Sequence, residues 1–203
     1  SPDNGALTPE PGMGSQPAMT STEAAFARFD ALPAVEIDDL LGAWRGESVP
    51  TGHPLDGALE AFHWHGKRFD SAEEVHPLVF RSLGGGRTCL EPRAMGPGLR
   101  LSGRVPIPTS PLAGRLFQLL LPLLGTRRSR ARLRMTRYRG VVSATMQYDH
   151  LPINDVFRKV DDDTVLGVMD LKGMETPFFF LLRREGPQPS HSVTISAAKA
   201  VSG

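Results

Sequence analysis

Short segments bounded by turn residues fill the C-terminal half of the chain. Alternation of apolar and polar residues predicts strands over residues 133–139 and 141–148, and short segments rich in apolar residues predict strands over 155–160, 164–171 and 176–183. Glycines and acidic residues, which favour turns, separate these segments. Because consecutive strands joined by short turns pair antiparallel, the pattern predicts a meander.

In the first half, short segments separated by turn residues likewise predict three shorter strands, at residues 67–69, 75–83 and 87–91. A period near 3.6 predicts helices in four places: residues 22–29, 36–41, 54–65 and 112–124. The fold class is therefore mainly β with helical insertions (α+β). We expect an antiparallel sheet that curls and closes into a β-barrel covered by short helices.

Two glycines bracket a tryptophan where the second helix gives way to a strand predicted over residues 44–49. Gly42 follows the helix as a C-cap would, and Gly46 permits a bend or bulge where the strand begins. Trp44 lies between them and is expected to be a buried anchor in the core.

Length and composition predict one domain over residues 20–185, with a disordered tail at 1–19 and a flexible tail at 186–203 that includes a weak edge strand at 193–195. The 203 residues carry 23 basic and 22 acidic side chains. The net charge is therefore too small to predict nucleic acid as a partner. The single cysteine, Cys89, excludes an intramolecular disulfide and fits a cytoplasmic protein. No apolar run is long enough to cross a bilayer.

Positive charge is concentrated directly after the apolar segment 112–124. Seven of the thirteen residues from 127 to 139 are arginine. Guanidinium groups beside an apolar helix could hold the phosphate of a lipid or contact an anionic membrane. The alternative is a core helix followed by a solvated strand.

Four side chains that could act as general acids or bases lie close together in the sequence at the end of the second C-terminal strand and just after it. They are Tyr148, Asp149, His150 and Asp155. The alternative is a turn in which Asp149 or Asp155 is a cap and pairs with Arg158. No nucleophile elbow, phosphate loop or dinucleotide-binding glycine pattern follows a strand.

The spacing of the histidines does not favour a metal site. On the helix predicted there, His63 and His65 would lie roughly 200° apart and could not converge on one metal ion. The acidic turn at 161–163 lacks the glycine and distant glutamate of a calcium loop. We therefore expect no metal and no cofactor, with haem held by a histidine as the remaining alternative.

Two blocks of sequence resemble a known family. The stretch 42–46, followed by His53–Pro54–Leu55 and by residues 64–69, is similar to the bacterial GXWXG protein family. Residues 138–160 and 166–170 resemble the domain of unknown function that accompanies it. The resemblance places the GXWXG part at about 36–92 and the companion part at about 130–185, and it carries over no catalytic residue.

A looser resemblance is to calycin-type barrels, which include lipocalins, fatty-acid-binding proteins and nitrobindin-like proteins. Their first strand carries a Gly-x-Trp, and in lipocalins an arginine of the last strand packs on that tryptophan. This resemblance implies a calycin-like β-barrel in which Arg183 or Arg184 packs on Trp44.

Together these features predict a non-catalytic protein that binds an apolar or amphipathic small molecule, a lipid with an anionic phosphate head. The expected ligand-binding residues are Arg132, Arg134, Arg137, Arg139, Trp44, Met146, Arg158, Met169, Phe178 and Phe180. The expected partners are this ligand and, peripherally, an anionic membrane surface. The alternative is an isomerase, cyclase or hydrolase of lipid or secondary metabolism, with Tyr148, Asp149, His150 and Asp155 as the acid–base groups.

Overall fold

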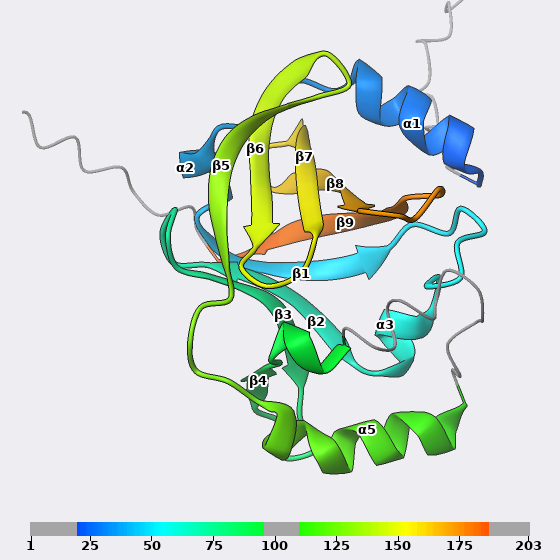
Figure 1. Cartoon of the computed structure of the whole chain (residues 1–203), viewed down its shortest axis with the longest axis vertical. Coiled ribbons are helices and arrows are strands. Elements are labelled where there is room, and N and C mark those ends of the chain that lie inside the picture. The colour runs from blue at the N-terminus through cyan, green and yellow to red at the C-terminus, as the bar shows by residue number, and fades with distance from the viewer. Residues whose placement is uncertain (1–19, 96–109, 187–203) are drawn as a thin grey trace, which may run out of the picture.

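The computed structural model describes residues 20–95 and 110–186, and Figure 1 shows its elements. The helices are α1 (Thr22–Ala31), α2 (Ile37–Leu40), α3 (Ala58–Ala61), the 3-10 turn η1 (Pro92–Met95) and α5 (Pro111–Leu124). The strands are β1 (Gly42–Ser48), β2 (Trp64–Phe69), β3 (Val75–Arg81), β4 (Arg87–Cys89), β5 (Ala131–Tyr138), β6 (Val141–Tyr148), β7 (Ile153–Asp161), β8 (Thr164–Leu171) and β9 (Phe178–Glu185). The predicted tail at 1–19, the edge strand at 193–195 and nearly all of the predicted C-terminal tail lie outside the described residues.

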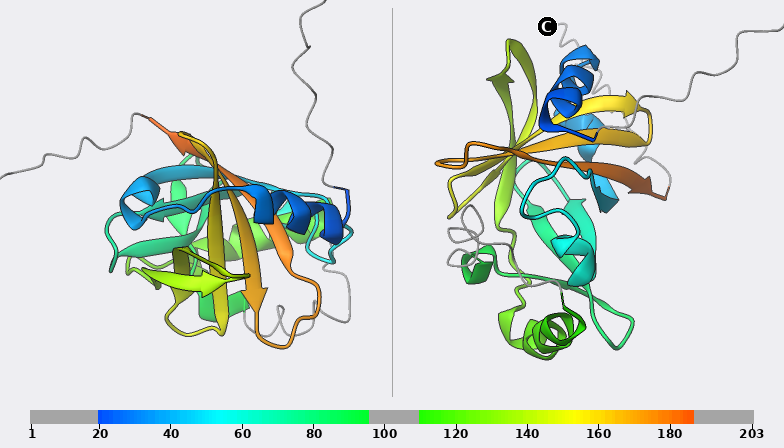
Figure 2. Two further views of the ribbon diagram at one scale, coloured as in Figure 1. Left: turned by 90° about the horizontal axis from the view of Figure 1, so that it is seen from above. Right: turned by 90° about the vertical axis from the view of Figure 1, so that its right-hand side faces the viewer.

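The strands form one antiparallel sheet that closes in a ring. The hydrogen-bonded order is β2-β1-β9-β8-β7-β6-β5-β3-β4, and a further pairing of β2 with β3 closes the ring, with β4 added at the side of β3. β3 and β5 meet at a single pair, Val75 opposite Ala131, so this is the narrowest seam of the ring. Figure 2 shows how the strands surround a common interior. The prediction of a mainly β fold with an antiparallel meander is confirmed for β5 to β9.

Alternation along the strands separates two cores. Phe178, Phe180 and Leu182 of β9 point into the ring and join the larger core. Phe179, between them, points outward and packs against Phe26 and Phe29 of α1, with ring centroids 5.1 and 6.5 Å away. Helix α1 starts as expected, because the Ser21 hydroxyl accepts a hydrogen bond from the amide of Ala24. It covers one outer face of the ring (Figure 1).

Trp44 and Arg184 join the first strand to the last. Trp44 is fully buried and donates from Nε1 to the carbonyl of Leu40 at 2.7 Å. The guanidinium of Arg184 lies 4.2 Å from the centre of the indole and donates to the carbonyls of Asp39 and Leu41. Of the two arginines expected to pack on Trp44, Arg184 does so, whereas the side chain of Arg183 is 58% exposed.

The prediction of a helix over residues 54–65 is wrong. Only Ala58–Ala61 are helical, and β2 already begins at Trp64. The Asp56 carboxylate accepts hydrogen bonds from three consecutive amides, those of residues 51–53, and thereby holds a tight loop. Gly57 and His63 then have φ values of 74° and 64°, which no right-handed helix contains. The backbone therefore forms turns on both sides of α3, which prevents a longer helix.

Helix α5 confirms the helix predicted over residues 112–124. The Ser110 hydroxyl accepts from the amide of Ala113, and Pro111 occupies the first turn, where a missing amide hydrogen costs nothing. Across residues 20–95 and 110–186, no helix combines the length and the apolar character that a membrane span requires.

Candidate ligand-binding cavity

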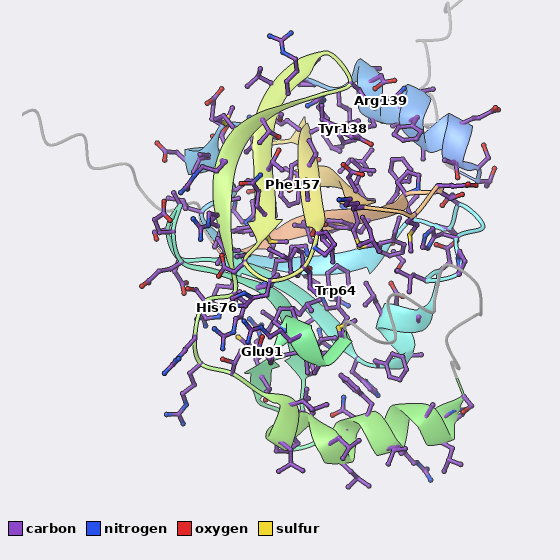
Figure 3. The ribbon with its side chains drawn as sticks, in the orientation of Figure 1. Trp64, His76, Glu91, Tyr138, Arg139 and Phe157 are labelled. Carbon is purple, nitrogen blue, oxygen red and sulfur yellow. The ribbon has the colours of Figure 1, made fainter. Side chains whose placement is uncertain are left out.

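The interior of the ring contains a cavity of about 80 Å³ at the end beside α3. Its walls are almost entirely apolar and come from α3 and its preceding loop, η1, β2, β3, the β6–β7 region, β8 and β9. The lining residues are Leu55, Ala58, Leu59, Phe62, Trp64, Lys67, Leu78, Met95, Tyr148, Leu151, Ile153, Asp155, Met169, Phe178 and Phe180. Figure 3 labels Trp64 on this wall, and Phe157 deeper in the ring.

Glycines on two strands leave room for the aromatic rings that form the wall. A Cβ atom at Gly46 would overlap the six-membered ring of Trp64, and one at Gly167 would overlap the ring of Phe180. Trp64 and Phe180 then meet edge to face, with centroids 6.0 Å apart. The strand begins at Gly42, so the expectation that Gly46 introduces a bend at the strand start is wrong. Gly46 lies inside β1, and the indole of Trp64 occupies the space that a side chain at this position would need.

Lys67 and Asp155 form an ion pair on the cavity wall. Lys67 Nζ lies 2.8 Å from Asp155 Oδ2, and the two side chains are 4% and 2% exposed. Nζ also donates to the carbonyl of Pro77 at 3.2 Å. Three aromatic rings surround the ammonium group, with centroids 4.9 to 5.9 Å from Nζ: those of Phe180, Trp64 and Tyr148. The ring faces compensate part of the hydration that Lys67 loses.

Burial raises the pKa of the Asp155 carboxyl, and the charge of Lys67 opposes this shift. Burial, together with the nearby Asp155 charge, raises the pKa of Tyr148 well above its ordinary value. The second oxygen of Asp155, Oδ1, is buried without a hydrogen-bond partner, and so is the indole Nε1 of Trp64. Such atoms cost free energy unless a ligand or water satisfies them.

The structure divides the predicted acid–base group. Tyr148 and Asp155 line the cavity, whereas Asp149 and His150 are exposed in the β6–β7 connection. Asp149 accepts from Arg132 at 3.3 Å. The predicted alternative pairing of Asp155 with Arg158 is wrong, because residues 155 and 158 point to opposite faces of β7.

Arg158 is fully buried on the outer side of the ring, beneath α1. Its guanidinium lies 4.7 Å from the ring centroid of Phe29 and donates to the carbonyl of Tyr138. Figure 3 shows Tyr138 and Arg139 at this end of the molecule. Arg158 is therefore separated from the cavity by the sheet itself.

The four arginines expected to bind a head group do not line the cavity. Arg132, Arg134 and Arg139 pair with Asp149, Glu73 and Asp30 respectively, and Arg137 is exposed. Among the apolar residues predicted as ligand contacts, Met169, Phe178 and Phe180 line the cavity, whereas Trp44 and Met146 are buried elsewhere in the same core.

His53, His65 and His76 each contact other side chains of the protein. His53 Nδ1 accepts from the amide of Leu55, and His53 Nε2 lies 3.1 Å from the sulfur of Met174. His65 bridges Glu185 and Arg81. His76 lies 3.3 Å from Asp70. Within the described ranges, no three histidine, cysteine or carboxylate side chains cluster as metal ligands do. The haem alternative is untested.

Lys67 is the functional candidate that the sequence reasoning missed. Its signal was weak, because β-bulges between Trp64, Gly66 and Arg68 interrupt the alternation that would have placed it inward. A lysine two positions before an inward phenylalanine, Phe69, is the pattern that could have identified it.

Fold and cavity together define a class: a mainly β protein whose antiparallel strands close in a ring around an apolar chamber. Two family models match the chain, GXWXG protein over residues 27–85 and a domain of unknown function (DUF4334) over residues 129–184. The chain belongs to the family of GXWXG proteins that carry this C-terminal domain, as its sequence motifs indicated.

A protein from Thermomonospora curvata, known from its crystal structure, is similar to this chain. The two are 34% identical, with a TM-score of 0.58, and the match covers 79% of this chain and 85% of that chain. None of the curated protein sequences compared with the chain matches it.

The two matched segments form opposite sides of the ring. The first contains β1 to β3, and the second contains β5 to β9. Lys67 belongs to the first segment and Asp155 to the second, so their ion pair joins the two segments at the cavity wall.

Proposed function

We propose that the protein binds an apolar or amphipathic small molecule in the cavity of a calycin-like barrel. The observation that carries this proposal is the pair of buried, partnerless polar atoms, Asp155 Oδ1 and Trp64 Nε1, on residues that line an otherwise apolar cavity. An acceptor and a donor of this kind fix the orientation of a ligand that the apolar walls hold.

The charge of the site restricts the group that enters it. Lys67 and Asp155 together are neutral, so a phosphate added beside them would leave an uncompensated charge in an apolar chamber. A hydroxyl, carbonyl or protonated carboxyl group avoids this cost. The anionic head expected from the arginine run would therefore lie outside the cavity, where Arg132, Arg134, Arg137 and Arg139 are accessible to solvent.

The cavity must adapt to hold a whole ligand. Its 80 Å³ is smaller than the roughly 150 Å³ that accommodates benzene in an engineered protein cavity. Met95 and Met169 on the wall have unbranched, flexible side chains, which repack at low cost. A ligand of lipid size would displace such side chains or extend beyond the cavity.

Native mass spectrometry of the purified chain tests the proposal by detecting a ligand that copurifies. Ala58→Leu, which fills the cavity from α3, should abolish that ligand peak and the saturable binding of an uncharged apolar fluorescent probe such as N-phenyl-1-naphthylamine. Ala94→Leu, the same change at an exposed site, is the matched control. Equal probe binding by the Ala58→Leu variant would refute the cavity as the binding site.

A catalytic role is the second candidate, and the raised pKa of Asp155 beside Tyr148 favours it. In this proposal Asp155 takes a proton from a bound substrate and Tyr148 donates one, as an isomerase or cyclase requires. The test is incubation of the copurified ligand with excess protein. A new product that Asp155→Asn does not form would indicate catalysis, whereas unchanged ligand would indicate binding alone.

A further inference from the structure

Helix α5 presents a face of leucines to solvent. Leu112, Leu116, Leu119, Leu120 and Leu123 are 76, 58, 69, 42 and 81% exposed. At 3.6 residues per turn these positions fall on one side of the helix. The opposite side, with Gly114, Gln118 and Leu121, is buried against the protein.

The contacts of the buried side fix the orientation of the leucines. Gln118 donates from Nε2 to the carbonyls of Phe62 and Arg81, at 3.2 and 3.0 Å. Phe117 packs between Phe62 and Phe80, with both ring centroids 5.0 Å away. A Cβ atom at Gly114 would meet the carbonyl of Ala61, so the helix backbone lies directly on α3. The leucine face cannot turn inward without breaking these contacts.

Charge decides what covers this face. Arg115 lies beside the leucines, and Arg127 and Arg128 follow the helix; all three side chains are exposed. Residues 110–130 contain no aspartate or glutamate, and no ion pair between described residues involves these three arginines. Two copies of α5 packed face to face would bring arginines together without counter-charges. An anionic lipid surface offers both the apolar interior and the negative charge.

Position and length agree with this partner. Figures 1 and 2 show α5 at one extremity of the molecule, with its long side facing outward. Its 14 residues span roughly 21 Å, too short to cross a bilayer but suited to lying in the plane of its surface.

We infer that α5 is a membrane-docking helix, whose five leucines enter the acyl region of an anionic bilayer while Arg115, Arg127 and Arg128 contact lipid phosphates. This binding does not require an occupant in the cavity. It does bring the membrane next to the cavity wall, because Phe62 both lines the cavity and packs on Phe117 of α5.

Flotation of the full chain with lipid vesicles tests the inference. We expect binding to phosphatidylcholine vesicles that contain phosphatidylglycerol, weaker binding to phosphatidylcholine alone, and a decrease with added salt. Combined replacement of Leu116, Leu119 and Leu123 by serine should lower the partition coefficient by more than about tenfold. Each Arg→Gln replacement at 115, 127 or 128 should lower it about fivefold on anionic vesicles.

Matched variants control for general surface effects. Leu83 is 73% exposed in the β3–β4 turn, so Leu83→Ser should leave binding unchanged where Leu123→Ser weakens it. Arg183→Gln is the corresponding control for the arginines. In Leu119→Trp, the new indole should shift its emission to the blue on anionic vesicles, whereas native Trp44 and Trp64 are buried.

Three outcomes would overturn the inference: no vesicle binding by the wild-type chain, equal binding by the triple leucine variant, or no emission shift in Leu119→Trp. A dimer that the triple leucine variant abolishes, without vesicle binding, would assign the face to a second copy instead. Circular dichroism of every variant separates these outcomes from loss of folding.

Discussion

Lys67 and Asp155 illustrate how single residues set the chemistry of this protein. Each belongs to a different matched segment, and each is charged in a core of aromatic side chains. Taking two charges out of water costs several kcal/mol per ion, and the attraction between them returns only part of this. An ion pair in this position is therefore poor evidence of a stabilising role.

Replacement of one partner should cost more than replacement of both. Asp155→Leu leaves the Lys67 charge buried, and Lys67→Met leaves the Asp155 charge buried, so each should lower the free energy of unfolding by about 3–5 kcal/mol. The double variant should lose less than either single variant, and therefore much less than their sum. Urea unfolding of the four proteins measures the coupling, and additive losses would show that the two charges do not depend on each other.

Gly46 provides a second prediction at this scale. In Gly46→Ala, the new methyl group collides with the ring of Trp64, and the overpacking should cost about 1–3 kcal/mol. Gly84→Ala places its methyl group in open space and is the control. Thermal unfolding of both variants checks the prediction. An unfolding temperature of Gly46→Ala equal to that of the wild type would contradict it.

At the scale of elements, the first and last strands depend on the contact between Trp44 and Arg184. This arginine is 2% exposed, and its guanidinium contacts the indole of Trp44, the carbonyl of Asp39 in α2, the carbonyl of Leu41 and the carboxylate of Asp163. It therefore connects α2, β1, β9 and the β7–β8 turn.

Arg184→Met should lower the free energy of unfolding by about 3 kcal/mol, because it leaves two half-buried carbonyls without donors and removes the guanidinium from the face of Trp44. Arg183→Met, one residue away on the solvent side, should change it by less than about 0.5 kcal/mol. Guanidinium chloride unfolding measures both. A similar loss for the two variants would mean that position in the strand, rather than the contact with Trp44, causes the effect.

At the scale of the whole molecule, buried histidines connect stability to pH. Burial lowers the pKa of His53 and of His76 from the ordinary value of 6.5, and for His76 the nearby Arg68 adds to the shift. The folded protein therefore binds fewer protons than the unfolded chain just below pH 6.5. The raised pKa of Asp155 acts in the opposite direction, but only below that native pKa.

Stability contributed by the histidines is fully present above pH 6.5 and is lost as the pH falls through their lowered native pKa values. The slope is at most about 1.4 kcal/mol per pH unit for each histidine. Urea unfolding between pH 5 and 8 should show this decline, and the double variant His53→Asn, His76→Asn should flatten it. An unchanged slope in the double variant would assign the decline to other groups.

Much of the fold follows from local patterns. Strands β6 and β8 have the predicted bounds, since each is a short segment with turn residues on both sides. Helix α5 likewise has a serine cap, a proline in its first turn and an apolar sequence. The helix predicted at 54–65 failed because the Asp56 loop, a tertiary arrangement of amides around one carboxylate, outweighed helical periodicity.

The sequence by itself determined the family and the mainly β architecture, because these depend on short-range periodicity and on motifs. It narrowed the arginine that would meet Trp44 to Arg183 or Arg184, and only the structure selected Arg184. Tertiary structure alone decided which residues share the cavity. Lys67 and Asp155 lie far apart in the chain, and only ring closure brings them within 2.8 Å. It also separated Asp149 and His150 from Tyr148 and Asp155, since side-chain direction depends on bulges and turns that periodicity does not encode.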